Sequence, residues 1–441
     1  MKNINIKKGY TQVFDVESRL EKAISSKEVA LTPSRIPFIK PKLLVKKGDL
    51  LKIGSPVFFD KRNPEIKFLS PAGGVVKNIV FGERRVIKKI LIVIEKEEYE
   101  QFESINHDKI SKTDRADLVK HIINGGLWPL FRELPYRDYP NKDKIPPQII
   151  VNLNSPEPEG PSPSVYLENE ENNFFAGLEI LNKLSDKTFI ISDASDEVPD
   201  QIDKLITHKV AGNYPANDPG TFLYHIKKNI PENSSWYIFG QDLIMIAKLV
   251  LSGKYPTDKV VTVSGSMNKD DNLHYRVRVG APLNDLVKHT FDDFKIIQGG
   301  VFRGYDTSDT PYSGYFENSF NLLKKEGEDA LFGFVMPGFK KNTVSKTFFS
   351  FLNTGTREIE CSLNGEERAC VNCGTCSKFC PVDMFPNITY KAVYADEVEE
   401  AIFSGLLDCV ECGVCSFVCP SKIELAKDLK NAKSEYYKEQ V

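Results

Sequence analysis

The strongest constraint on the fold of this chain is a cysteine pattern that occurs twice near its C-terminus. The first copy, CVNCGTCSKFCP, covers residues 370–381, and the second, CVECGVCSFVCP, covers residues 409–420. Each cysteine of the second copy lies 39 residues after its counterpart in the first. Eight of the nine cysteines in the 441 residues belong to these copies. Such close-set thiolates in a large chain are typical of metal ligands in a reducing compartment, whereas disulfides would be spread through the fold.

The spacing C-x₂-C-x₂-C-x₃-C-P is that of bacterial ferredoxins, which hold two [4Fe–4S] clusters. Three cysteines of one copy bind one cluster, and the fourth binds the other cluster. Soft thiolates suit iron in such clusters, whereas zinc sites use cysteine pairs with longer separations. The predicted ligands are Cys370, Cys373, Cys376 and Cys419 for cluster 1, and Cys409, Cys412, Cys415 and Cys380 for cluster 2.

The chain between the two copies favours an α-helical ferredoxin domain over residues 361–441. A compact ferredoxin of the β-hairpin type would need a shorter connection. Apolar residues between positions 383 and 407 recur at helical spacing, and the Lys- and Glu-rich residues 423–437 predict a closing helix. Cys361 lies outside both copies, and we interpret it as a small apolar residue or a free thiol.

Composition narrows the class of protein. A formal charge of −3 gives no electrostatic reason to expect a nucleic acid partner. No apolar stretch approaches the roughly 20 residues that a membrane helix needs, and the N-terminus lacks the apolar core of a signal peptide. We therefore expect a cytoplasmic chain that does not span a membrane itself.

Residues 1–98 predict an all-β domain. Turn glycines alternate with short apolar strands in residues 45–59 and 70–79, and residues 89–94 form a closing strand. This arrangement resembles the barrel-sandwich hybrid modules of biotinyl and lipoyl carriers. Lys61 follows Asp60 at a place comparable to the modified lysine of a carrier, but Arg62 stands where the carrier motif has a small apolar residue. We interpret Lys61 as a solvated turn residue without covalent lipoyl or biotin.

The middle of the chain predicts three further units, making a multidomain α+β protein. Residues 113–257 alternate strands and helices, which indicates an α/β Rossmann-like domain with a mostly parallel sheet. Residues 258–302 suggest a hairpin, a short helix and a returning strand, as in a β-grasp-like (SLBB) module, and residues 303–360 suggest a mixed helical connector. The predicted strands of the α/β domain are residues 148–153 and 188–192, and its predicted helices are residues 117–124, 174–184 and 241–252.

Taken together, the order of units resembles the NqrA family of the Na⁺-translocating NADH:quinone reductase over nearly the whole chain. The residues that carry this resemblance are 48–64, 70–75, 126–132, 174–181, 263–265, 278–281 and 332–339. Many members of that family have a C-terminal region that looks like a ferredoxin domain without its cysteines. This chain has all eight cysteines, as does the related RnfC component of Rnf-type electron-transport complexes.

That Rnf relative also carries a glycine-rich loop for FMN and NADH. At the corresponding place this chain has Gly125, Gly126, Leu127 and Trp128. A phosphate cradle needs small residues so that backbone N–H groups can approach the anion, and Leu127 and Trp128 would fill that space. We therefore expect the α/β domain to have lost its FMN.

The resemblance implies a peripheral subunit on the cytoplasmic face of the cell membrane, in an ion-translocating NADH:quinone oxidoreductase. Its partners would be the membrane subunits of an Nqr/Rnf-type complex, with ubiquinone as a further candidate. No catalytic constellation is visible, so the isolated chain is expected to relay electrons through two [4Fe–4S] clusters without catalysing a reaction itself. Two alternatives remain open, namely an RnfC-type protein that oxidises or reduces NAD(H) through FMN, and a structural docking subunit with no electron-transfer role.

Overall fold

The computed structural model describes residues 1–11, 14, 16–17, 19–21, 26–155, 157–265, 272–286, 294–307, 311–325, 337–339, 341, 344, 348–352 and 366–440. Cys361 and most of the segment 332–339 lie outside these residues. Within the described part of the chain, no helix is both long enough and apolar enough to cross a membrane.

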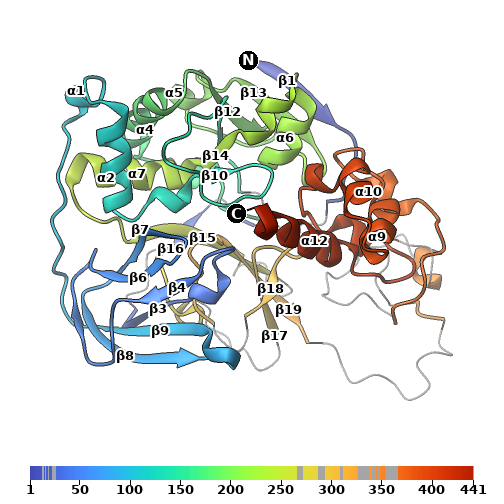
Figure 1. The fold of residues 1–441 in the computed structure, drawn as a ribbon, viewed down its shortest axis with the longest axis horizontal. Coiled ribbons are helices and arrows are strands. Elements are labelled where there is room, and N and C mark those ends of the chain that lie inside the picture. Colours follow the sequence, from blue (N-terminus) through green and yellow to red (C-terminus); the bar gives the residue numbers. More distant parts are fainter. Residues whose placement is uncertain are drawn as a thin grey trace.

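The N-terminal unit is a pair of small antiparallel sheets, with strand orders β3-β9-β8-β5 and β4-β6-β7 (Figure 1). Phe58 and Phe68 stack between neighbouring strands with ring centroids 4.7 Å apart. A Cβ atom at Gly74 would lie 1.8 Å from the carbonyl oxygen of Val93, so only glycine allows these strands to approach. The strands are β3 (Glu28–Leu31), β4 (Pro41–Leu43), β5 (Leu50–Leu51), β6 (Pro56–Asp60), β7 (Asn63–Leu69), β8 (Gly74–Phe81) and β9 (Ile87–Ile94).

The second unit is a six-stranded sheet of order β1-β13-β12-β11-β14-β10, parallel except for β10. β11 has apolar side chains on both of its faces. Ile149 and Val151 pack with α4 and α7, and Ile150 packs with α6 on the other face. Helices on both faces are what a parallel sheet requires. The strands are β10 (Arg132–Glu133), β11 (Ile149–Asn152), β12 (Thr188–Asp193), β13 (His208–Gly212) and β14 (Trp236–Phe239). The helices are α1 (His107–Ile110), α2 (Arg115–Asn124), α3 (Pro163–Tyr166), α4 (Glu171–Leu184), α5 (Asp200–Asp203), α6 (Pro219–Ile226) and α7 (Gly240–Ser252).

Two strands of the predicted N-terminal unit belong to other sheets. β1 (Lys2–Ile6) pairs in parallel with β13 at the edge of the α/β sheet, and β2 (Leu20–Glu21) pairs with β16. The prediction of one all-β unit over residues 1–98 is therefore wrong for these strands. The reason is that pairing partners about 200 residues away leave no local trace in the sequence.

The third sheet has the order β18-β17-β19-β15-β16-β2. The predicted hairpin is confirmed, because β15 and β16 pair antiparallel. The helical prediction for residues 303–360 is wrong at its start, because β18 and β19 lie there. Phe320 and Leu322 of β19 are buried in the core of this sheet, which stabilises a strand between β15 and β17. The strands are β15 (Asp258–Gly265), β16 (Leu273–Arg278), β17 (Phe294–Gln298), β18 (Tyr305–Asp306) and β19 (Ser319–Lys324).

Residues 366–440, here called the cysteine domain, are helical and lie beside the α/β sheet (Figure 1). The helices predicted between and after the two cysteine copies are present. α8 and α9 start 39 residues before α11 and α12, so the internal repeat of the sequence is also a repeat of structure. The helices are α8 (Thr375–Phe379), α9 (Pro386–Tyr394), α10 (Val398–Phe403), α11 (Val414–Phe417) and α12 (Leu425–Gln440).

Candidate metal centre in the cysteine domain

The two cysteine loops have the same backbone shape. Gly374 and Gly413 have φ of 70° and 82°, and each is the N-cap of the short helix that carries the third cysteine of its copy. Two positions earlier, Asn372 and Glu411 have φ of 55° and 56°. Left-handed residues at equal places let both loops turn tightly around their cysteines. The sequence therefore codes the same loop twice.

The fourth cysteine of each copy lies with the other copy. Cys380, from the first copy, packs in one apolar cluster with Cys409 and Cys412, whereas Cys419 packs with Cys376. Half-buried Cys370 and Cys415 both border the group of Cys376 and Cys419, and Cys415 is also close enough to Cys412, Cys409 and Cys380 to interact with their charges. This exchange of the fourth cysteine is the arrangement that a two-cluster ferredoxin needs.

The electrostatics of these thiols fit a cationic group. Burial and the neighbouring Cys409 thiolate contribute to raising the pKa of Cys380 to about 12. Removal from water, followed by the thiolates of Cys412 and Cys409, raises the pKa of Cys415 well above its usual value. Ionisation of several thiols in one buried group requires positive charge among them, which iron would supply in a cubane cluster. In the described residues the His, Cys, Asp and Glu side chains do not converge closely enough to form a finished metal site.

The two groups differ in their access to solvent. Cys373 is exposed, and although partial burial opposes it, hydrogen bonds from Thr375 lower the pKa of Cys373. By contrast, Cys409 and Cys412 are buried against the α/β domain. The first cysteine loop is therefore more accessible to solvent than the second at these positions.

Three buried side chains donate hydrogen bonds to the backbone of the second cysteine loop. Arg137 donates to the carbonyl of Val410 at 3.3 Å, and the Tyr214 hydroxyl donates to that of Cys412 at 3.0 Å. Lys433 of α12 donates to the carbonyl of Cys409 at 2.7 Å. These donors bind the loop through its carbonyls, while the N–H groups of Glu411 and Val414 donate to the sulfurs of Cys409 and Cys412.

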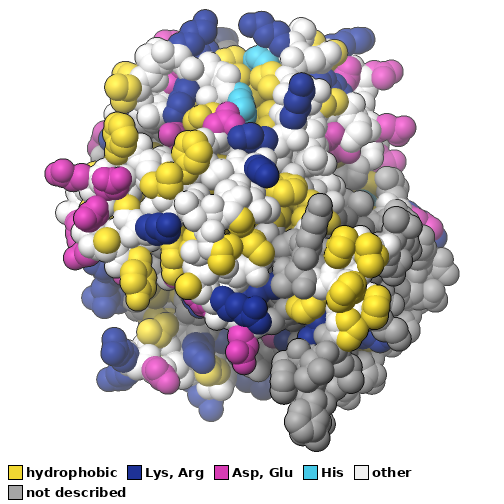
Figure 2. Space-filling model, turned by 90° about the vertical axis from the view of Figure 1, so that its right-hand side faces the viewer, with side chains coloured by type: hydrophobic (Ala, Val, Ile, Leu, Met, Phe, Trp, Pro, Cys, Tyr) yellow, Lys and Arg dark blue, Asp and Glu magenta, His cyan; other side chains and the backbone are white. Residues whose placement is uncertain are grey.

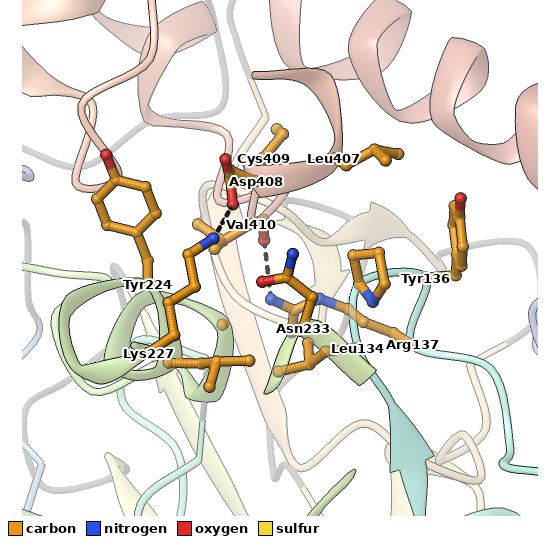
Figure 3. A pocket seen from close by; sticks show the side chains of 13 residues that line it. Leu134, Tyr136, Arg137, Tyr224, Lys227, Asn233, Leu407, Asp408, Cys409 and Val410 are labelled. Carbon is orange, nitrogen blue, oxygen red and sulfur yellow. Dashed lines mark hydrogen bonds and ion pairs between the residues drawn. The ribbon is translucent and has the colours of Figure 1, made fainter. Parts of the chain in front are cut away.

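A small cavity of about 180 Å³ separates the second loop from the α/β domain (Figure 3). Arg137 and Lys227 reach across it to Val410 and Asp408, and Lys227 meets the Asp408 carboxylate at 2.6 Å. Both cationic side chains come from the α/β domain. This interface therefore joins the two domains directly at a cysteine ligand loop.

The sequence did not predict these anchoring residues. Arg137 and Tyr214 lie in loops whose partners are about 200 or more residues away, so no local pattern indicates them. The burial of Lys433 could have been predicted from the sequence, because Lys433 follows Leu425 and Leu429 at helical spacing on the buried face of α12. A lysine in that position is unusual and points to a buried partner.

Gly125 and Gly126, at the place of the predicted former phosphate-binding loop, lie in the core. A Cβ atom at Gly126 would lie 2.6 Å from the Leu69 side chain, so this glycine allows the first two domains to pack closely. Leu127 and Trp128 are fully buried, and the Trp128 indole donates to the carbonyl of Pro140. The side chains that stand in place of small residues thus fill this space.

Lys61 is exposed in the turn between β6 and β7. Its neighbours have a structural role, because Arg62 bridges the buried carboxylates of Asp60 and Asp138 at 2.8 and 2.6 Å. Asp138 belongs to the α/β domain. Arg62, next to Lys61, therefore links the N-terminal domain to the α/β domain.

Family models match three parts of the chain. Residues 4–95 match the NqrA N-terminal barrel-sandwich hybrid domain, and residues 113–255 match the NqrA second alpha/beta domain. Residues 363–433 match a 4Fe-4S dicluster domain. Over its length the chain is 30% identical to the NqrA protein of the Na(+)-translocating NADH-quinone reductase of Histophilus somni strain 2336, with 92% of each chain covered. The chain belongs to the NqrA family of the Na⁺-translocating NADH:quinone reductase.

The NqrA protein of Saccharophagus degradans gives the same result, with 31% identity and 88% of each chain covered. Among solved structures, an NAD⁺-reducing [NiFe]-hydrogenase in the H₂-reduced state aligns with a TM-score of 0.34 and 11% identity, over 50% of this chain and 49% of that one. That score is too low to indicate a shared overall fold. The NqrA family assignment therefore rests on the full-length relatives and the two NqrA domains.

Proposed function

We propose that this NqrA-family chain relays electrons through two [4Fe–4S] clusters in a helical ferredoxin-like domain. The observation that supports this most is the exchange of the fourth cysteine, which groups Cys380 with the second copy and Cys419 with the first. A [4Fe–4S] cluster, when bound, supplies one-electron exchange. The residues of this chain hold the ligand loops and control access to them.

The proposed relay has an exposed end and an anchored end. Cys373 is exposed at cluster 1, whereas Arg137, Tyr214 and Lys433 enclose the loop of cluster 2. A partner protein would exchange electrons at cluster 1, and the second contact would form where the α/β domain meets cluster 2. Leu127 and Trp128 support the absence of an FMN from the glycine loop, because they fill the space that a phosphate would need.

The domain also offers a surface for docking on membrane subunits. Figure 2 views the molecule from the side where α9 and α10 lie, and hydrophobic side chains are spread over that face among charged ones. Exposed apolar groups of this kind are typical of interaction sites. We propose that this side faces the partner proteins, on the cytoplasmic face of the membrane. The exposed apolar residues of the cysteine domain include Val371, Phe385, Ile388, Tyr394 and Phe403.

The direct test is iron and acid-labile sulfide analysis of anaerobically purified protein. Two clusters require about eight of each per chain, and dithionite should produce EPR signals from both. An iron-free chain would leave only the docking role. Bound FMN, or reduction of the clusters by NADH in the isolated chain, would instead support the Rnf-type alternative.

A further inference from the structure

We propose that Lys433 and Glu411 form a charge pair that sets the reduction potential of cluster 2, the cluster assigned to Cys409, Cys412, Cys415 and Cys380. Both are positioning residues, because neither is a ligand. This inference rests on the proposed function, since it requires that cluster 2 is bound.

The geometry places both charges at the ligand loop. The Lys433 side chain is 3% exposed, its Nζ donates to the carbonyl of Cys409 at 2.7 Å, and it lies 3.3 Å from a Glu411 carboxylate oxygen. Glu411 stands between Cys409 and Cys412 in sequence, and its side chain is 14% exposed. A fixed charge in such a low-dielectric place acts strongly on a redox group beside it.

The first copy provides an internal comparison that lacks this pair. Asn372 takes the place of Glu411 and accepts a hydrogen bond from the Asn387 amide at 2.7 Å. Tyr394 takes the place of Lys433 and is 85% exposed. The loops have the same shape, so the two copies differ in charge and not in backbone.

The backbone shows that Glu411 is not the easiest residue at its position. Asn372 and Glu411 have φ of 55° and 56°, and asparagine adopts this left-handed conformation more readily than glutamate. The second copy therefore keeps a carboxylate where the first copy shows that a neutral residue suits the turn. Strain of this kind is typical of positions kept for function.

Other charges also lie near this loop, and the cations Arg137, Lys430 and Arg303 act on Glu411 as well. Arg137 forms two hydrogen bonds with the Asp218 carboxylate, at 2.7 and 3.0 Å, and Arg303 lies 3.4 Å from the same group. Lys433 and Glu411 can each be neutralised without replacing a cysteine, although Lys433→Met also removes the hydrogen bond to the Cys409 carbonyl. Because reduction adds negative charge, a nearby cation favours the reduced form and a nearby carboxylate disfavours it.

The test is an anaerobic redox titration of the full-length, cluster-loaded protein followed by EPR. Lys433→Met should move the midpoint potential of cluster 2 lower, and Glu411→Gln should move it higher. The double variant should return close to the wild-type value, and cluster 1 should not move in any of them. Lys427→Met is the matched control, because Lys427 lies exposed on the same helix and pairs with Glu424. A Cys412→Ala variant identifies which signal belongs to cluster 2.

The inference is overturned if the two single variants shift the midpoint potential of cluster 2 in the same direction. It is also overturned if both clusters shift equally, or if neither potential changes. If Lys433→Met fails to assemble cluster 2, the isosteric Glu411→Gln variant provides the test. An unchanged midpoint potential of cluster 2 in Glu411→Gln would then refute the inference. Wild-type protein without iron would instead refute the proposed function. If the wild-type protein binds both clusters but the variants have the wild-type midpoint potential, only the charge-pair inference is refuted.

Discussion

Arg137 holds the Asp218 carboxylate with two hydrogen bonds and also donates to the carbonyl of Val410. Asp218 in turn caps α6 by accepting from the N–H of Gly220. Both charged side chains are buried. A single ion pair thus joins a helix start of the α/β domain to a cysteine ligand loop.

Removing one partner of this pair should weaken the contact between the two domains. Asp218→Asn leaves the buried Arg137 and Arg303 cations without the carboxylate that they share, which costs about 3–5 kcal/mol of unfolding free energy. Urea unfolding measures the loss, and hydrogen exchange should rise in residues 405–420. Lys142→Met is the control, because its pair with Glu65 is at the surface, where an ion pair contributes little to stability. Equal losses in the buried and surface variants would contradict this role.

The two equivalent loop glycines should differ sharply in their tolerance of alanine. At Gly374 an added Cβ meets nothing within 4 Å, so Gly374→Ala costs only the left-handed backbone, roughly 1–2 kcal/mol. At Gly413 the Cβ would lie 1.9 Å from the carbonyl oxygen of Phe302, so Gly413→Ala should cost more, roughly 3 kcal/mol or above. Thermal unfolding of the two loaded variants gives the comparison. Similar melting temperatures would show that the Phe302 segment does not pack on this loop.

The exchange of the fourth cysteine predicts which variants share a spectrum. Cys380→Ala should perturb the same EPR signal as Cys412→Ala, although the two residues come from different copies. Cys419→Ala should likewise match Cys373→Ala. If Cys380→Ala instead matched Cys373→Ala, each copy would hold its own cluster and the ligand assignment would fail.

Glu157 should make stability depend on pH. Burial and the neighbouring Glu317 raise the pKa of Glu157 to about 7, whereas an unfolded glutamate titrates near 4.5. The folded state therefore binds more protons between these values, and stability is lost as the pH rises through this window. Glu157→Gln should stabilise the protein by about 1–2 kcal/mol at pH 8.5 and have little effect at pH 4. Urea titrations at both values test this, with exposed Glu399→Gln as a control that should change neither.

Local sequence patterns predicted much of the fold. The strands near 149–152 and 188–193 and the helices α2, α4 and α7 lie where apolar periodicity placed them. In each case the signal lies within a short stretch, because strand alternation and helix period are local properties. The repeated cysteine spacing is local too, and the ligand assignment drawn from it stays a prediction for spectroscopy to test.

What the sequence could not show depends on distant partners. β1 joins a strand about 200 residues away, and β19 inserts between β15 and β17, so neither placement follows from its own residues. Arg137 and Tyr214 meet the cysteine loop only after the α/β domain and the cysteine domain have packed together. Lys433 is the exception, because its place on the apolar face of α12 could have been read from helical spacing.

The position of β1 has a consequence for how the protein is made. The strand is made before its partner β13, which follows about 200 residues later, a delay of about 10–40 s at usual elongation rates. Tyr10, just after β1, waits longer still, because its ring packs on Phe379 and Phe417 of the cysteine domain. The first ten residues therefore dock in two steps, β1 once β13 has been made and Tyr10 only after synthesis has reached the cysteine domain.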